Sequence, residues 1–199
     1  MMAINRMMTW LAAFTVGALL LASGPGSAEP WDDHLTAAGA AFRSGKPAEA
    51  EKHYLSALKE AEAFGPDDVR LGATLDQLAA AYMAQDKAAD AEKALRRALP
   101  IWEKIFGAMP DMQPVISEKI DLLIEALDAQ KKYGDVESLV KRSLGITEEL
   151  LGRNHVQMAE KLETFAPVLR AAGKEAEAKA METRAKSIRV GRANNIGED

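Results

Sequence analysis

The chain has 199 residues, with 25 Lys and Arg against 30 Asp and Glu, 48% hydrophobic residues, 6% aromatic residues and no cysteine. This composition excludes low-complexity disorder, collagen and a disulfide-stabilised miniprotein. The length suits one domain, and the net charge of −5 provides no general attraction for nucleic acid or anionic lipid.

The first 28 residues have the order of a secretory signal peptide. One positive charge at Arg6 precedes an uncharged apolar run, Met7–Ala22, and the small residues of 23–28 follow. We expect cleavage between Ala28 and Glu29 and a secreted or periplasmic protein. The alternative is an uncleaved membrane anchor, but the run of 16 residues is shorter than the roughly 20 needed to span a bilayer.

From Trp31 onward the apolar residues recur at helical spacings, and no segment alternates as a strand does. A four-residue pattern with spacings of 3, 1 and 3 recurs four times, and its copies start 40, 45 and 42 residues apart. The copies are Leu35, Ala38, Gly39, Phe42; Leu75, Leu78, Ala79, Tyr82; Ile120, Leu123, Ile124, Leu127; and Leu162, Phe165, Ala166, Leu169.

Each copy is followed by a break and then by a second helix. The expected breaks are Gly45, Asp86, Lys131 and Gly173. The buried stripes of the first three second helices are Ala50, Tyr54, Ala57; Ala91, Leu95, Ala98; and Val136, Val140, Ser143. The pattern therefore predicts a domain over 29–190, with repeats at about 31–66, 67–109, 110–153 and 154–190. The last helix has a wettable face and caps the array, and a disordered tail spans 191–199.

These residues resemble tetratricopeptide repeats, of the longer type found in kinesin light chains. The resemblance is clearest at 78–107 and 150–173, and it covers the whole chain after the apolar run. One departure is His155-Val156, where the family often has His-Pro before the next repeat. The resemblance implies an all-α, right-handed α-solenoid of about four helix-turn-helix repeats. It also implies a non-enzymatic scaffold whose first helices line a concave, protein-binding surface.

The residues that catalysis or metal binding needs are sparse. The three histidines, His34, His53 and His155, have no metal-ligand spacing, and thiol chemistry is impossible without cysteine. Gly45-Lys46-Pro47 is a turn rather than a phosphate loop, since proline stands where Ser or Thr would meet magnesium. We therefore expect a protein without catalytic activity, cofactor or bound metal, and we expect His155 to cap a helix.

Seven acids are expected on the concave surface. Four of them follow one stripe of the third repeat's first helix, opposite its apolar positions, and three lie on the neighbouring first helices. They are Asp76, Glu118, Asp121, Glu125, Asp128, Glu160 and Glu163. We read them as an acidic groove for a Lys- or Arg-bearing protein segment; the alternative is an ordinary solvated face. A clamp for a C-terminal carboxylate, known in the resembling family, is disfavoured because acids occupy the matching positions.

The repeats and the acids together are compatible with two functions. The first is an exported, non-enzymatic scaffold that recruits a protein or peptide with a basic segment. The alternative is a structural protein that self-assembles through its repeat ends, for which the outward face of the first pair, Ala37, Ala41 and Tyr54, would have to be apolar.

Overall fold

The computed structural model describes residues 30–196, and the expected signal peptide lies outside them. The chain divides into two compact units, residues up to Ala108 and residues from Met109. The described residues of the first unit, 30–108, contain four helices. They are α3 (Pro30–Arg43), α4 (Pro47–Ala63), α5 (Val69–Met83) and α6 (Ala88–Phe106).

The second unit repeats this arrangement after a short 3-10 helix, η1 (Pro110–Met112). Its helices are α7 (Gln113–Ala129), α8 (Val136–Leu151), α9 (Val156–Ala171) and α10 (Glu175–Ile196). No helix among the described residues is long and apolar enough to cross a bilayer.

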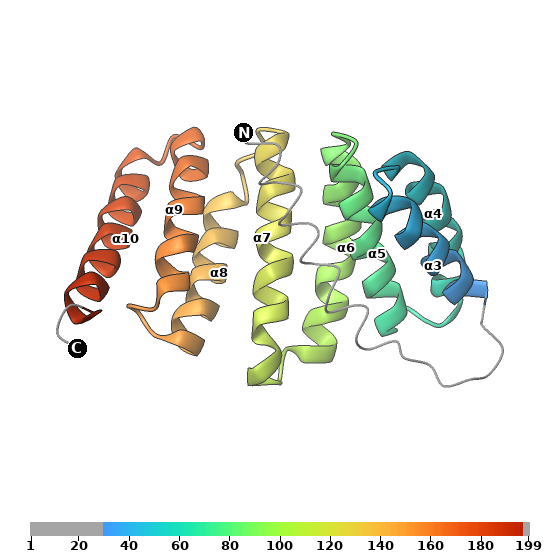
Figure 1. Ribbon diagram of the computed structural model, residues 1–199, viewed down its shortest axis with the longest axis horizontal. Helices are drawn as coiled ribbons and strands as arrows, with labels where there is room; N and C mark the ends of the chain where they lie inside the picture. Colours follow the sequence, from blue (N-terminus) through green and yellow to red (C-terminus); the bar gives the residue numbers. More distant parts are fainter. Residues whose placement is uncertain (1–29, 197–199) are drawn as a thin grey trace. The chain divides into compact units, whose positions relative to one another are not determined.

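Successive helices of each unit pack as antiparallel pairs, α3 with α4, α5 with α6, α7 with α8 and α9 with α10 (Figure 1). Within the units, α4 also packs on α5 and α8 packs on α9. The expected all-α fold of about four helix-turn-helix repeats is confirmed. The right-handed sense of the solenoid stays a prediction.

The repeated pattern occupies the first helix of every pair, and its members are largely buried. In the third and fourth copies all eight side chains are at most 3% exposed. In the first copy Leu35 and Phe42 are only partly buried and pack against the cluster of Ala38, Tyr54 and Leu78. Burial of one face of each helix against its neighbours is what stabilises such a fold, because short helices are marginal alone.

The four expected breaks are the points where the chain reverses. Gly45, Asp86, Lys131 and Gly173 all have positive φ, between 57° and 78°. The residue after each break donates its N–H to a carbonyl five residues back, for example Lys132 to the Leu127 oxygen at 2.9 Å. This is the hydrogen bond of a Schellman motif, which ends a helix in a left-handed residue.

Helix beginnings also follow local chemistry. Asp68 caps α5 by accepting the N–H of Arg70 at 2.9 Å. His155 caps α9, because its Nδ1 accepts the N–H of Gln157 at 3.3 Å, so the capping role predicted for this histidine is confirmed.

The self-assembly alternative required an apolar outward face that includes Ala41 and Tyr54. These residues are 7% and 1% exposed and belong to the core of the first unit, as the predicted buried stripe of Ala50, Tyr54 and Ala57 implies for Tyr54. One expectation differs from the structure. The end of the chain is helical for longer than expected, because α10 continues to Ile196 rather than ending at 190. Adding residues to a helix that is already formed costs far less than nucleating one, so Gly191 does not stop it.

Candidate functional site

An open hollow in the second unit collects three of the seven predicted acids, Glu118, Asp121 and Glu160. Glu118 and Asp121 are one turn apart on α7, and Glu160 is on the first turns of α9. Both helices bury the opposite sides, where Ile120 and Leu162 are 0% and 2% exposed. The amphipathic pattern of the two helices therefore directs the acids away from the core.

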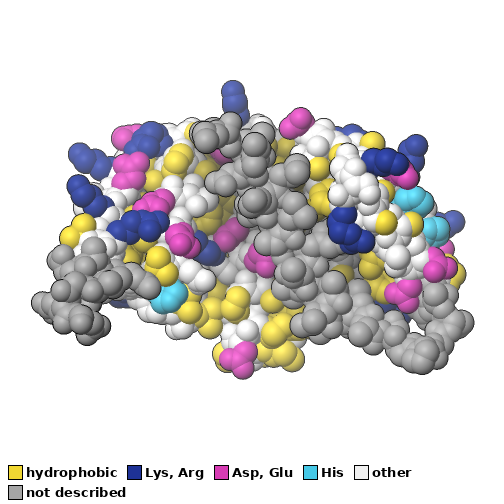
Figure 2. All heavy atoms as spheres, viewed as in Figure 1, with side chains coloured by type: hydrophobic (Ala, Val, Ile, Leu, Met, Phe, Trp, Pro, Cys, Tyr) yellow, Lys and Arg dark blue, Asp and Glu magenta, His cyan; other side chains and the backbone are white. Residues whose placement is uncertain are grey.

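The hollow has a volume of about 650 Å³ and combines carboxylates with apolar side chains. Asp111 adds a fourth carboxylate, while Pro114, Leu150 and Leu151 form its apolar part. The remaining lining residues are Ser117, Thr147, Gln157 and Lys161. Figure 2 shows the second unit with acidic side chains over its middle and hydrophobic side chains below them.

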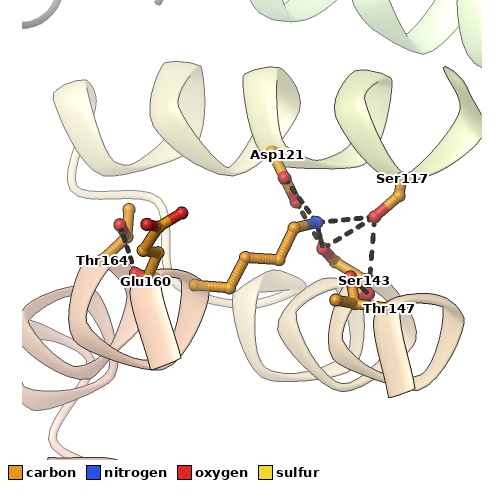
Figure 3. Close-up of polar contacts among 7 residues, drawn as sticks. Ser117, Asp121, Ser143, Thr147, Glu160 and Thr164 are labelled. Carbon is orange, nitrogen blue, oxygen red and sulfur yellow. Dashed lines mark hydrogen bonds and ion pairs between the residues drawn. The ribbon is translucent and has the colours of Figure 1, made fainter. Parts of the chain in front are cut away.

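Lys161 joins three helices at the edge of this hollow. Its Nζ lies 2.7 Å from Asp121 Oδ2 and donates to Ser117 Oγ at 2.6 Å and to Ser143 Oγ at 2.7 Å (Figure 3). Ser143, on α8, also donates to Asp121 Oδ1, and Thr147 donates to the Ser143 carbonyl at 3.0 Å. The cluster thereby links α7, α8 and α9 through one ammonium group.

The cluster links the three helices, because one amine has three oxygen atoms within 2.7 Å, from Asp121, Ser117 and Ser143. Partial burial raises the pKa of Asp121, while the charge and hydrogen bond of Lys161 act to lower it.

The charge of the hollow is negative. Four carboxylates and one ammonium line it, and that ammonium is already committed to Asp121. Glu118 lies 3.3 Å from the amine of the buried Lys119. Within residues 30–196, Asp111 and Glu160 are in no ion pair, and in Figure 3 no dashed line reaches the Glu160 carboxylate. The hollow can therefore accept a cation and repel an anion.

The other three predicted acids of the second unit do not line the hollow. Asp128 accepts a hydrogen bond from Tyr133 at 3.3 Å. Glu163 holds the Arg189 guanidinium through two contacts of 2.6 Å, which lower the pKa of Glu163. Glu125 is partly buried elsewhere on α7. The four acids of the predicted stripe all lie on α7, but they have different surroundings.

Asp76 belongs to the first unit and differs most from the expected open acid. It is 6% exposed, and its Oδ2 accepts the Trp102 indole N–H at 3.0 Å. Trp102 in turn packs on α5, where its ring lies about 3.1 Å from the position a Cβ of Gly72 would take. This acid serves the packing of α5 on α6.

Sequence reasoning missed Lys161, Asp111 and the two leucines. Lys161 had a readable signal: it directly precedes Leu162, whereas Asp121 directly follows Ile120, and these two apolar residues open neighbouring copies of the pattern. Opposite charges flanking equivalent positions of adjacent first helices are placed to meet. Asp111 and the leucines lie outside the pattern, so their convergence required the structure.

The comparisons with known proteins identify the repeat. A sequence model of the tetratricopeptide repeat matches residues 34–104. The search of curated proteins returned no match. Among solved structures, BtubC (BKLC) from P. vanneervenii is similar with a TM-score of 0.70 and 20% identity, over 92% of this chain and 74% of that one. A protein from Podosopora anserina with nearly identical TPR-like repeats of kinesin-light-chain type covers 85% of this chain and 100% of its own, at 16% identity and a TM-score of 0.42.

The similarity to BtubC supports the fold alone. The second structure has a lower TM-score, and we draw no conclusion from it. Tetratricopeptide repeats are typically non-catalytic and generally act as protein-binding scaffolds. Residues 34–104 of this chain match the tetratricopeptide repeat in sequence, and its described residues form four helix-turn-helix pairs of the same kind.

Proposed function

We propose that this protein is a non-enzymatic scaffold that binds a basic segment of another protein at the acidic hollow of its second unit. The observation that carries the proposal is the convergence of Asp111, Glu118, Asp121 and Glu160 on one open hollow whose single cation is already paired. A Lys or Arg side chain entering there meets Asp111 and Glu160, which are in no ion pair within the described residues, beside Glu118 and Asp121, which already contact Lys119 and Lys161.

The test removes charge from the hollow without disturbing Lys161. Asp111→Asn, Glu118→Gln and Glu160→Gln are combined, and binding of a fluorescent peptide of alternating Lys and Ser is measured by anisotropy. Exposed charge pairs contribute about 0.2–1 kcal/mol each, so the triple variant should bind about tenfold more weakly. Raising the salt concentration should weaken the wild-type complex in the same direction.

A matched control carries the same change in net charge away from the hollow. Asp32, Asp33 and Glu60 belong to the first unit, do not line the hollow and are in no ion pair within the described residues. Their combined substitution by Asn and Gln should leave the affinity within about twofold. Equal losses in both triple variants would mean that only the overall charge of the chain matters, and the site would be rejected.

We also propose that the scaffold works after export. The order of charged, apolar and small residues in 1–28 supports this, and the first described helix, α3, begins at Pro30, so cleavage after Ala28 removes no residue of a described helix. The intact mass of the exported protein should correspond to a chain that begins at Glu29. A mass that includes residues 1–28 would contradict cleavage.

A further inference from the structure

The apolar part of the hollow has no role in binding a bare cation. Leu150 and Leu151 are neighbours at the end of α8 and remain 37% and 40% exposed. Only three other large hydrophobic residues among the described ones are as open, namely Leu55, Met109 and Val190. One exposed leucine needs no explanation, but two adjacent leucines and Pro114 at one hollow form a surface that a partner can cover.

The charges at the hollow restrict what can cover these leucines. Asp111 and Glu160 have no ion-pair partner within residues 30–196, and the Lys161 ammonium has no donor left for a guest. An acidic or phosphorylated segment would be repelled, and a wholly apolar one would bury carboxylates without a partner. A metal ion alone does not fit either, since no group of three or more metal-ligating side chains occurs among the described residues.

We infer that the hollow selects a peptide segment in which a Lys or Arg lies within two residues of an aliphatic side chain. The aliphatic side chain covers Leu150 and Leu151, and the cation lies among Asp111, Glu118 and Glu160. The volume of about 650 Å³ lies within the range of pockets that enclose small ligands, roughly 300–1,000 Å³, so it holds more than one side chain. This inference rests on the proposed function and adds to it an aliphatic side chain of the bound segment as a second contact beside its Lys or Arg.

The experiment uses a synthetic library of random peptides on the full chain without residues 1–28. Peptides that remain bound after washing are sequenced, and the enriched residues are compared with the input library. We expect enrichment of Lys or Arg together with Leu, Ile, Val or Met within two positions. Lys or Arg enriched without an aliphatic neighbour would overturn this inference and leave the proposed function intact, whereas no enrichment of basic residues would overturn both.

The leucines are then tested directly with the best enriched peptide. The double variant Leu150→Ser/Leu151→Ser should bind it about tenfold more weakly, whereas Leu55→Ser, an equally open leucine on α4, should have no effect. Replacing the aliphatic residue of the peptide by Ser should cost the wild type about the same factor, a change that does not touch the fold of the protein. Unchanged affinity in both comparisons would reject the inference.

A second copy of this chain is the competing occupant, and light scattering distinguishes it. If the leucines contact another copy, the wild type will form a dimer whose mass falls to that of a monomer in Leu150→Ser/Leu151→Ser. That outcome would overturn the inference, whereas a monomer at all concentrations agrees with it.

Discussion

The two units build the same pairs of helices, but the buried polar groups of α5 in the first unit and of α7 in the second find different hydrogen-bond partners. In the first unit every residue of α5 from Leu71 to Ala80 is buried, and three aromatic side chains donate hydrogen bonds to its polar residues. Trp31 donates to Thr74 at 2.9 Å, Tyr54 to Gln77 at 3.4 Å and Trp102 to Asp76 at 3.0 Å. In the second unit, Ser117 and Asp121 of α7 are served by Lys161 and Ser143.

This difference separates a closed, uncharged packing from an open, charged one. An indole N–H or a phenol O–H satisfies an acceptor without bringing a charge, and its ring adds buried apolar area. A lysine brings a charge that is costly to remove from water, and the Lys161 and Asp121 side chains remain 21% and 29% exposed. The first unit thus closes around its polar groups, whereas the second keeps acids at an open hollow.

The largest expected effect is the loss of an aromatic donor from the first unit. Trp102→Ala removes a ring that is 3% exposed and stacks on Phe106 with 5.5 Å between ring centroids. Gly72 beneath it has no side chain to fill the space, so the free energy of unfolding should fall by about 3–5 kcal/mol. Urea unfolding followed by circular dichroism measures this. A loss below about 1 kcal/mol would show that the ring is not a main packing element.

The matching change in the second unit should cost less. Lys161→Met keeps the length of the side chain but removes the ammonium from Asp121, Ser117 and Ser143. Because the pair is partly exposed, we expect a loss of about 1–3 kcal/mol at neutral pH in the same urea experiment. A loss as large as that of Trp102→Ala would remove the distinction between the two units.

The pH dependence of this variant makes the comparison sharper. Burial already raises the pKa of Asp121, and Lys161 opposes that rise, so Lys161→Met should raise the pKa further. A carboxyl whose pKa is raised in the folded state favours folding most at low pH, and this contribution is lost as the pH rises through the folded-state pKa. The loss in free energy of unfolding of Lys161→Met, relative to the wild type, should therefore be smaller at pH values below the folded-state pKa of Asp121. In an Asp121→Asn background this pH dependence should disappear.

The sequence was sufficient for the features that repeat. Four apolar copies at fixed spacing predicted the first helix of each pair, and each of the four predicted breaks proved to hold a left-handed residue, because helix packing and helix termination are local. The environment of each acid was not local. Asp76 and Asp121 follow Leu75 and Ile120 at equivalent positions, yet a tryptophan meets one and a lysine the other. Only the tertiary structure distinguishes them.

The smallest predicted effect compares the turns that the two units share. Gly45 and Gly173 suit their left-handed conformation, whereas Asp86 and Lys131 hold φ values of 58° and 57° with a side chain. An L-residue costs about 1 kcal/mol or more in this conformation, and the greater flexibility of glycine in the unfolded chain offsets part of any gain.

Lys131→Gly should therefore raise the free energy of unfolding by about 0.5–1 kcal/mol. Asp86→Gly should gain less, because aspartate tolerates this conformation better than lysine. The reverse changes, Gly45→Ala and Gly173→Ala, should each lose stability through the backbone alone, since an added Cβ would meet no atom within 4 Å at either site. Equal gains at Asp86 and Lys131 would mean that the side chain of Asp86 adds nothing at its turn.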